Sequence, residues 1–364
     1  MITSAQAARL LDRDIQPVYG PEARELLQDQ TVLVTGAGGS IGSEIARQAL
    51  QLGAGCVYFL DQDEYALHSL QLDLYGVGLL DDERFVLCDI RDRHSVDRIF
   101  AEAKPSIVYH AAAHKHLPLL ERSPAAAVQT NVLGTRTIAR ACIENGVQRF
   151  INISTDKAAD PSSVLGMTKR LAELVTSSVA GLGTRVASVR FGNVLGSRGS
   201  LFPTLAWQIA SGRTVKVTHP DVSRYFMTIP EAAGLVMEAS VLASRGETYV
   251  LDMGPSIKVL DLIERYVALV GAHDLSIEFT GLRPGEKLHE DLFDPSEVRT
   301  DTAHPRIWQV NADQAGSVSP QAIHDLCTDA LAGVSPGRLR ILLADLVTPV
   351  SNVLAPQELT RWAG

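Results

Sequence analysis

Two short runs of the sequence carry residue types that could bind a dinucleotide and transfer protons. The first is Thr35-Gly36-Ala37-Gly38-Gly39-Ser40-Ile41-Gly42, which follows an apolar, β-branched run. Glycines at 36, 39 and 42 permit a tight turn, a close approach of the backbone to a pyrophosphate, and packing of a helix against the strand. The free N–H groups at the start of that helix favour phosphate oxygens. The run therefore predicts a dinucleotide site.

An acid follows at the spacing that such a site requires. Asp61 ends the next apolar run, where a carboxylate can accept hydrogen bonds from a ribose 2′-hydroxyl and repel a 2′-phosphate. This position favours NAD over NADP. A glycine-rich turn with a capping acid is the alternative interpretation. Asp89 ends the third run, where it could face the adenine or serve as a turn acid.

The second run is Ile153-Ser154-Thr155-Asp156-Lys157, with Lys169 in a helical stretch beyond it. It closes a predicted strand at the carboxyl edge, where open α/β sheets bind their ligands. Taken alone, an Asp-Lys pair at a strand end could simply be exposed to water.

The elements that would position these residues alternate along the chain. Short apolar runs at 31–36, 56–61, 84–89, 106–112, 149–155, 186–193 and 248–253 are separated by stretches with helical spacing. This order predicts an α/β fold: a doubly wound Rossmann parallel sheet of about seven strands with a smaller C-terminal substrate-binding domain. The expected parts are a helical extension at 1–28, an NAD-binding domain at 29–195, a nucleotide-sugar cap at 196–310, and a helical segment at 311–364. Residues 226–255 are expected to contribute to the NAD-binding domain as well.

Composition narrows the class of protein. The 364 residues include 33 Lys+Arg and 42 Asp+Glu, a net charge of −9, which disfavours nucleic acid as a partner. Four cysteines lie far apart without CxxC spacing, as in a reduced cytoplasmic setting. We expect a cytoplasmic protein without a membrane partner, because no signal-peptide pattern and no run of about 18 apolar residues occurs.

An ordered set of motifs identifies the family that this chain resembles. The motifs are TGAGGSIGSE, AAAHKHLPLLE, TNVLGT, STDKAADP, RFGNVLGSRGS, THPDVSRYFMTIPEAA and GLRPGEKLHEDL. Over about residues 8–310 the chain resembles CapD-like polysaccharide-biosynthesis proteins, the C5-inverting UDP-N-acetylglucosamine 4,6-dehydratases of the extended short-chain dehydrogenase/reductase superfamily. The lead AARLLDRDIQPVYGPEARELL is similar to the segment that joins membrane spans to the catalytic part in long members.

The resemblance implies a redox-neutral loss of water. Oxidation at C4 by the cofactor acidifies H5, a base removes that proton, an acid protonates the departing C6 hydroxyl, and the hydride returns to C6. The family's acid and base correspond to Asp156 and Lys157, with Thr155 on the C4 oxygen and Lys169 on the nicotinamide ribose. We expect positive charge from Lys169 and an oxidised nicotinamide to lower the pKa of Lys157.

One position departs from the pattern. Superfamily members usually place Tyr four residues before the helix lysine, and long membrane-bound relatives place Met there, whereas this sequence has Leu165. Leucine cannot transfer a proton, so Lys157, Asp156 or a water held by Thr155 would have to remove the C4 hydroxyl proton.

The resemblance also implies the binding residues. The expected cofactor-binding set is Gly36, Gly39, Ser40, Ile41, Gly42, Asp61, Asp89, Ile90, Ala111, Ala113 and Lys169. For the nucleotide sugar we expect Lys115 at the sugar, Asn193, Arg224 and Arg283 at the diphosphate, Glu286 at the nucleoside ribose, and Pro203 and Thr218 at the uracil. Arginine's planar fork suits phosphate oxygens. His114 and His116 lack an accompanying carboxylate cluster, so we expect no metal.

Three functions follow from these residues. The first is a 4,6-dehydratase acting on a UDP-N-acetylhexosamine with NAD. The second keeps cofactor and substrate but gives a C5 or C4 epimerase, or a dehydratase that releases a 5,6-unsaturated sugar. The third, which Leu165 makes conceivable, is a non-catalytic protein that binds UDP-sugar and NAD. A homo-oligomer is expected from the resemblance alone.

Overall fold

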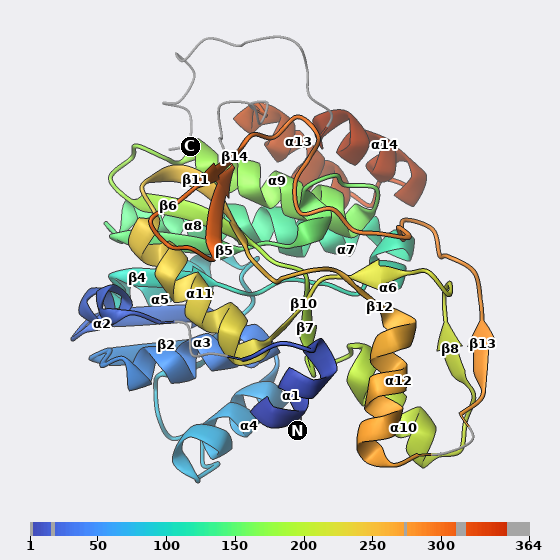
Figure 1. Ribbon diagram of the computed structural model, residues 1–364. Helices are drawn as coiled ribbons and strands as arrows, with labels where there is room; N and C mark the ends of the chain where they lie inside the picture. Colours follow the sequence, from blue (N-terminus) through green and yellow to red (C-terminus); the bar gives the residue numbers. More distant parts are fainter. Residues whose placement is uncertain (1–2, 16–18, 273–274, 311–317, 348–364) are drawn as a thin grey trace.

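The architecture is built around one large sheet (Figure 1). The computed structural model describes residues 3–15, 19–272, 275–310 and 318–347. The strands of the sheet are β1 Thr31–Thr35, β2 Cys56–Asp61, β3 Phe85–Leu87, β4 Ile107–His110, β5 Arg149–Ile153, β6 Arg185–Arg190, β11 Arg245–Leu251, β14 Arg299–Asp301 and β15 Ile307–Val310. Within the described ranges they form a nine-stranded sheet in the order β14-β15-β11-β6-β5-β4-β1-β2-β3.

The seven strands from β3 to β11 correspond to the seven apolar runs, and every pair among them is parallel. The predicted doubly wound Rossmann sheet is therefore confirmed. The sheet is extended by β15 and β14, which pair antiparallel at the β11 edge. These two strands come from residues 299–310, which were expected to belong to the cap.

Helices cover both faces of the sheet, because its strands are apolar on both sides. Val32 and Val34 of β1 pack into one core with Ile45, whereas Leu33 between them packs into the other core with Phe100. Successive strand residues point to opposite faces, so a continuous apolar run fills two cores. The helices around the sheet are α2 Pro21–Leu27, α3 Ser40–Gln51, α4 Glu64–Tyr75, α5 Arg93–Ala103, α8 Thr135–Glu144, α9 Val164–Ser178 and α11 Ile229–Leu242.

Short helical pieces connect some of these elements. They are α6 Leu117–Arg122, α7 Pro124–Ala127, the π-type turn η1 Val128–Gly134 and the 3₁₀ turn η2 Asp156–Ala158. Helix α9 begins at Val164 because the Ser163 hydroxyl accepts a hydrogen bond from the Gly166 N–H over 3.1 Å. Leu165 and Lys169 therefore stand one turn apart on the same side of α9.

A smaller group of elements extends from the centre to the lower right of Figure 1. They are β7 Asn193–Leu195, α10 Leu201–Ala210, β8 Val215–Val217, β9 Ser223–Arg224, β10 Phe226–Thr228, β12 Ile257–Lys258, α12 Val259–Val270 and β13 Ile277–Phe279. Pairing of β8 with β13 and of β9 with β12 closes this group around Leu205, Val215 and Ile263.

Both ends of the chain add helices. Helix α1 Ser4–Leu11 packs against α12 through Leu10 and Leu262. Helices α13 Pro320–Leu331 and α14 Pro336–Val347 pack near α9. Residues 311–317 and 348–364 of the predicted C-terminal segment lie outside the described residues. Among the residues described, no helix combines the length and the apolar character that crossing a bilayer would take.

Candidate functional site

A glycine turn joins β1 to α3 at the carboxyl edge of the sheet. Gly36 has φ of +66°, and a Cβ there would lie 2.6 Å from the Ala112 backbone nitrogen. A Cβ on Gly42 would lie 2.1 Å from the Gly36 carbonyl oxygen. Neither position can carry a side chain, so the tight turn and the close helix packing predicted from the sequence are both present.

Gly39 differs from these two glycines. Among the described residues, and apart from its own chain neighbours, a Cβ at this position would meet only the Gly36 carbonyl oxygen, at 3.1 Å, and Gly39 lines two adjoining pockets. The missing side chain therefore leaves room for a ligand beside the N-terminus of α3. This cradle fits the pyrophosphate of a dinucleotide.

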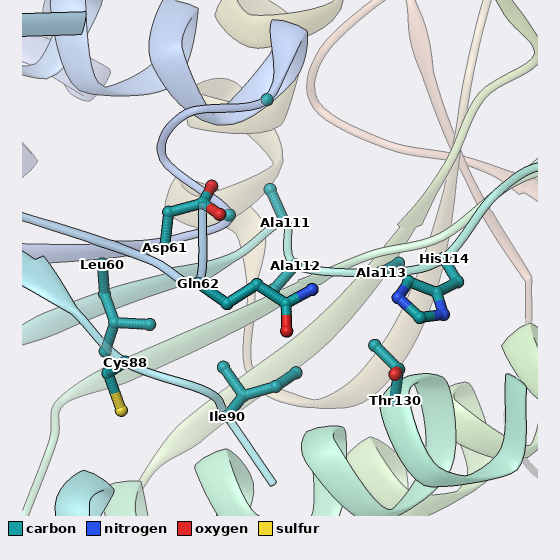
Figure 2. Close-up of a pocket in the computed structure, with 12 residues that line it drawn as sticks. Leu60, Asp61, Gln62, Cys88, Ile90, Ala111, Ala112, Ala113, His114 and Thr130 are labelled. Carbon is teal, nitrogen blue, oxygen red and sulfur yellow. The ribbon is translucent and has the colours of Figure 1, made fainter. Parts of the chain in front are cut away.

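The first pocket has a volume of about 140 Å³ and lies where the strand order reverses between β1 and β4. Figure 2 shows Asp61 and Gln62 toward one end of it and His114 with Thr130 toward the other. The Asp61 carboxylate accepts hydrogen bonds from the Gly38 N–H over 2.9 Å and the Asp63 N–H over 3.0 Å. Each oxygen keeps a free lone pair, so the anchored carboxylate can still accept a hydrogen bond from a ribose hydroxyl.

The other predicted residues of this pocket divide into two groups. Ile90, Ala111 and Ala113 line it. The Asp89 carboxylate is instead paired with the Arg91 guanidinium at 2.5 Å, and these hydrogen bonds lower the pKa of Asp89. The wall beside Asp61 is apolar, formed by Leu60, Cys88 and Ile90.

A second pocket of about 420 Å³ continues from the first and shares Gly39, Ala111, Ala113 and His114 with it. The predicted site residues along it are Gly39, Ser40, Ile41, Gly42, Ala111, Ala113, Lys115, Thr155, Lys157, Leu165, Lys169 and Asn193. The structure thus brings the glycine turn together with Thr155 and Lys157 in one continuous groove, although Thr155 follows Gly42 by 113 positions in the sequence.

Asp156 is buried between Thr155 and Lys157, in the turn η2, and is not itself one of the residues that line the groove. Its Oδ1 accepts hydrogen bonds from the Thr155 hydroxyl, the Lys157 N–H and the Lys157 ammonium, each over 2.9 Å. Within the described part of the chain its Oδ2 is buried without a hydrogen-bond partner, and a Cβ on Gly192 would lie 2.9 Å from it. An unpaired buried oxygen is costly, which is typical of an atom retained for chemistry.

Lys157 carries a positive charge in this arrangement. Burial alone would lower its pKa, but the charges of Asp156 and Glu290 and the hydrogen bond to Asp156 outweigh burial and raise it. The ammonium lies 3.8 Å from the Glu290 carboxylate. The protein's own charges therefore raise the pKa of Lys157, where a lower pKa was expected, and the part of that expectation that rests on an oxidised nicotinamide stays a prediction. The pKa of Lys157 follows its burial and the charges of Asp156, Glu290 and Arg224, and Lys169 is not among the groups that shift it.

Lys169 behaves in the opposite way. Its buried ammonium donates to the Ile153 carbonyl oxygen over 2.5 Å, and burial lowers its pKa to about 8, an effect that Glu173 partly opposes. Leu165, one turn earlier in α9, lines the groove beside it. The structure thus places an apolar side chain at the position where the superfamily usually has tyrosine.

The predicted nucleotide-sugar residues gather mostly around Glu286. Its carboxylate accepts from the Thr218 hydroxyl over 3.2 Å and the Arg283 N–H over 3.3 Å, and lies 3.4 Å from the Arg224 guanidinium. Asn193 lies apart from this cluster, with its Oδ1 3.5 Å from the Lys157 ammonium. Pro203 is exposed on α10, next to the groove-lining Phe202.

Two further predicted contacts have defined partners. Lys115 donates to the Arg198 carbonyl oxygen over 2.8 Å, and burial lowers its pKa. In the described residues no group of three or more His, Cys, Asp or Glu side chains is gathered as metal ligands would be. The expected absence of a metal stays a prediction.

Glu290 was not predicted as a site residue. It is 7% exposed, and its Oε1 lies 3.8 Å from both the Lys157 ammonium and the Arg224 Nε. One feature of the sequence could have indicated that Glu290 belongs to the site. The motif GLRPGEKLHEDL contains Glu290, but only Arg283 and Glu286 were assigned from that motif.

The parallel sheet, the glycine cradle and the groove at the strand-order reversal define a Rossmann-type nucleotide-binding protein. Comparison with known proteins narrows this class. Residues 32–312 match the family model described as "Polysaccharide biosynthesis protein", and the chain belongs to that family, as its motifs predicted.

Three relatives illustrate the family. The chain is 45% identical over 294 residues to "Capsular polysaccharide biosynthesis protein CapD" of Staphylococcus aureus, covering 79% of this chain and 49% of that protein. It thus spans about half the length of this relative. It is 30% identical to "UDP-N-acetylglucosamine 4,6-dehydratase (inverting)" of Campylobacter jejuni, covering 77% of this chain and 80% of that protein. It is 31% identical to "UDP-glucose 4-epimerase" of Rickettsia rickettsii, covering 74% of this chain and 79% of that protein.

A solved structure shares the fold. It is described as "X-ray structure of Pen from Bacillus thuringiensis" and superposes with a TM-score of 0.72 at 33% identity, covering 78% of this chain and 87% of that chain. The fold is thus that of extended short-chain dehydrogenase/reductase proteins.

Proposed function

We propose that this chain is an NAD-dependent nucleotide-sugar 4,6-dehydratase that acts on a UDP-N-acetylhexosamine and inverts C5. The observation that supports the proposal is the Asp156–Lys157 pair: Lys157 lines the groove, one Asp156 carboxylate oxygen holds its ammonium, and the other has no hydrogen-bond partner among the described residues. A simple epimerisation at C4 needs no second acid–base pair, whereas loss of water across C5 and C6 needs both a base and an acid.

The groove has the parts that NAD and a sugar would need. Gly39 leaves room for the pyrophosphate, and Asp61 presents a fixed carboxylate to the adenosine ribose. A bound nicotinamide would supply reversible removal of the sugar's C4 hydrogen and its return at C6. Thr155 would orient the C4 oxygen, and Lys169 would hydrogen-bond the nicotinamide ribose. Asn193, Arg224 and Arg283 would hold the diphosphate.

Asp156 and Lys157 can reach their catalytic forms together. The charges of Asp156 and Glu290 keep the proton on Lys157, and in this form the lysine cannot act as a base. Transfer of one proton over 2.9 Å, from Lys157 Nζ to Asp156 Oδ1, breaks an N–H bond and forms an O–H bond without changing the net charge. The products are a neutral amine that can remove H5 and a carboxylic acid that can protonate the departing C6 hydroxyl.

The proposal is tested with UDP-N-acetylglucosamine and NAD in deuterated water. We expect a product that has lost one water and carries deuterium at C5, detected by mass spectrometry and NMR. A product of unchanged mass with altered stereochemistry would identify the chain as an epimerase, the activity named for its Rickettsia relative. Binding of UDP-sugar without turnover would identify a non-catalytic protein.

The remaining expectations are part of the same proposal. A cytoplasmic setting, the absence of nucleic-acid and membrane partners, and a homo-oligomeric assembly are expected for such an enzyme and stay predictions. Preference for NAD over NADP rests on Asp61.

A further inference from the structure

Glu290 lies between Lys157 and Arg224. In the proposed function Lys157 is a catalytic residue and Arg224 binds the diphosphate. Glu290 comes from the loop before β14, far in sequence from both Lys157 and Arg224, yet its carboxylate is 3.8 Å from a nitrogen of each. Arg224 is held by the same loop, because its guanidinium donates to the carbonyl oxygens of Lys287 and Leu288. The loop thus carries one carboxylate into the space between a catalytic and a binding residue.

The charges around this carboxylate are nearly balanced. Lys157 is faced by Asp156 on its own turn, by Glu290 and Arg224 from the cap side, and by the Asn193 amide oxygen. Glu290 is faced by Lys157, Arg224, Lys287 and Asp156. Burial and the Asp156 charge raise the pKa of Glu290, while the cations around it oppose that shift. An isolated carboxylate would be costly here, so it depends on both cations.

We propose that Glu290 is a positioning residue, a counter-ion shared between Lys157 and Arg224 that anchors the lysine beside the reacting sugar and links its charge to the diphosphate site. The inference rests on the proposed function for the task of each cation. The geometry itself does not depend on that function. Because one carboxylate serves two cations, a change in the charge of either cation changes the other's electrostatic environment.

The proposal has two measurable consequences, and neither is expected if Glu290 only stabilises the fold. Removing the Glu290 charge should lower the pH at which Lys157 loses its proton by about one unit, the usual effect of an opposite charge at this range. It should also free the Arg224 charge, so that UDP binds more tightly, by about threefold to tenfold. A variant that only damaged the fold would bind UDP more weakly.

The test compares Glu290→Gln with wild type by two methods. Competitive labelling of Lys157 with an amine-reactive reagent across pH, read by peptide mass spectrometry, gives the titration midpoint. Calorimetry with UDP gives the affinity. Asp291→Asn is the matched control, because Asp291 is the adjacent carboxylate but is exposed and 3.7 Å from Lys287. We expect this control to leave both quantities at their wild-type values.

A second variant gives an effect of opposite sign. Arg224→Gln should raise the Lys157 midpoint, because the arginine's charge lowers the pKa of that lysine in wild type. Because that repulsion acts directly, Glu290→Asp decides the question if Glu290→Gln does not fold: its shorter side chain withdraws the carboxylate from both nitrogens, so it should lower the Lys157 midpoint and tighten UDP binding, each by less than expected for Glu290→Gln. An unchanged Lys157 midpoint in the Glu290 variants would overturn the inference. So would a shifted midpoint with unchanged UDP affinity in Glu290→Gln.

Failure of the proposed function is distinguishable from failure of this inference. If wild type produces no dehydrated sugar but the Lys157 midpoint and UDP affinity respond as expected, the shared counter-ion stands and the assigned reaction is wrong. If wild type dehydrates the sugar but neither quantity responds, the reaction stands and Glu290 has no such role.

Discussion

The ammonium group of Lys169 in α9 donates a hydrogen bond to the carbonyl oxygen of Ile153 at the end of β5, over 2.5 Å. This contact fixes the helix to the strand directly beneath the groove. Burial lowers the lysine's pKa from the ordinary 10.5 to about 8. The folded protein therefore holds this proton less tightly than the unfolded chain does.

That difference predicts how stability depends on pH. Between about pH 8 and 10.5 the unfolded chain binds the proton that the folded protein has lost, so the free energy of unfolding rises with pH. Relative to Lys169→Met, wild type should gain up to about 3 kcal/mol between pH 7 and pH 10. Urea unfolding at several pH values measures this. Lys216→Met, at an exposed lysine, should show no such trend.

Replacing Asp156 by Asn should separate oxidation from loss of water. The amide cannot donate the proton that the C6 hydroxyl needs, so dehydration should fall by at least about a hundredfold while C4 oxidation continues. Reduced cofactor should then accumulate and be visible in the near-ultraviolet absorbance. Asp160→Asn is the control, because this acid is exposed and paired with Lys287. Dehydration at the wild-type rate in Asp156→Asn would rule out the acid role.

The sheet could be predicted from the sequence because its seven parallel strands are apolar on both faces. The glycine turn could be predicted because Gly36 and Gly42 meet backbone that excludes a Cβ. β14 is short and exposed and carries no comparable pattern, so it was missed. The raised pKa of Lys157 could not be predicted either, because it depends on how burial is balanced against the charges of Asp156 and of Glu290, which a distant loop brings close.

Removing the Asp61 carboxylate should relax discrimination between dinucleotides. Asp61→Ala eliminates the charge that would repel a 2′-phosphate, so the ratio of the NADP and NAD dissociation constants should fall by roughly tenfold or more. Fluorescence titration with each dinucleotide measures the ratio. Asp63→Asn keeps the side-chain oxygen that accepts from the Ala66 N–H at the start of α4, and should preserve the wild-type preference. An unchanged ratio in Asp61→Ala would remove this residue from the ribose site.

Substitutions at Leu165 can show whether removal of the C4 hydroxyl proton limits the rate. Leu165→Tyr supplies a phenol one turn before Lys169, whose positive charge favours the phenolate. If that proton limits turnover, cofactor reduction in a stopped-flow experiment should be about tenfold faster or more. Leu165→Phe adds the ring without the hydroxyl and should give no acceleration. Equal rates for Tyr and Phe would show that another base, such as Lys157, already suffices.

Substitutions at two glycines of the turn should have different effects, since Gly42 is needed for folding and Gly39 for binding of the cofactor. Gly42→Ala places a Cβ 2.1 Å from the Gly36 carbonyl oxygen, in backbone that cannot give way, so the melting temperature should drop by several degrees. At Gly39 a Cβ meets protein only at 3.1 Å, so Gly39→Val should melt within a few degrees of wild type. Its side chain would occupy the cradle, and NAD affinity should fall by about tenfold or more. Scanning calorimetry and NAD titration separate the two effects, and wild-type NAD affinity in Gly39→Val would show that the pyrophosphate binds elsewhere.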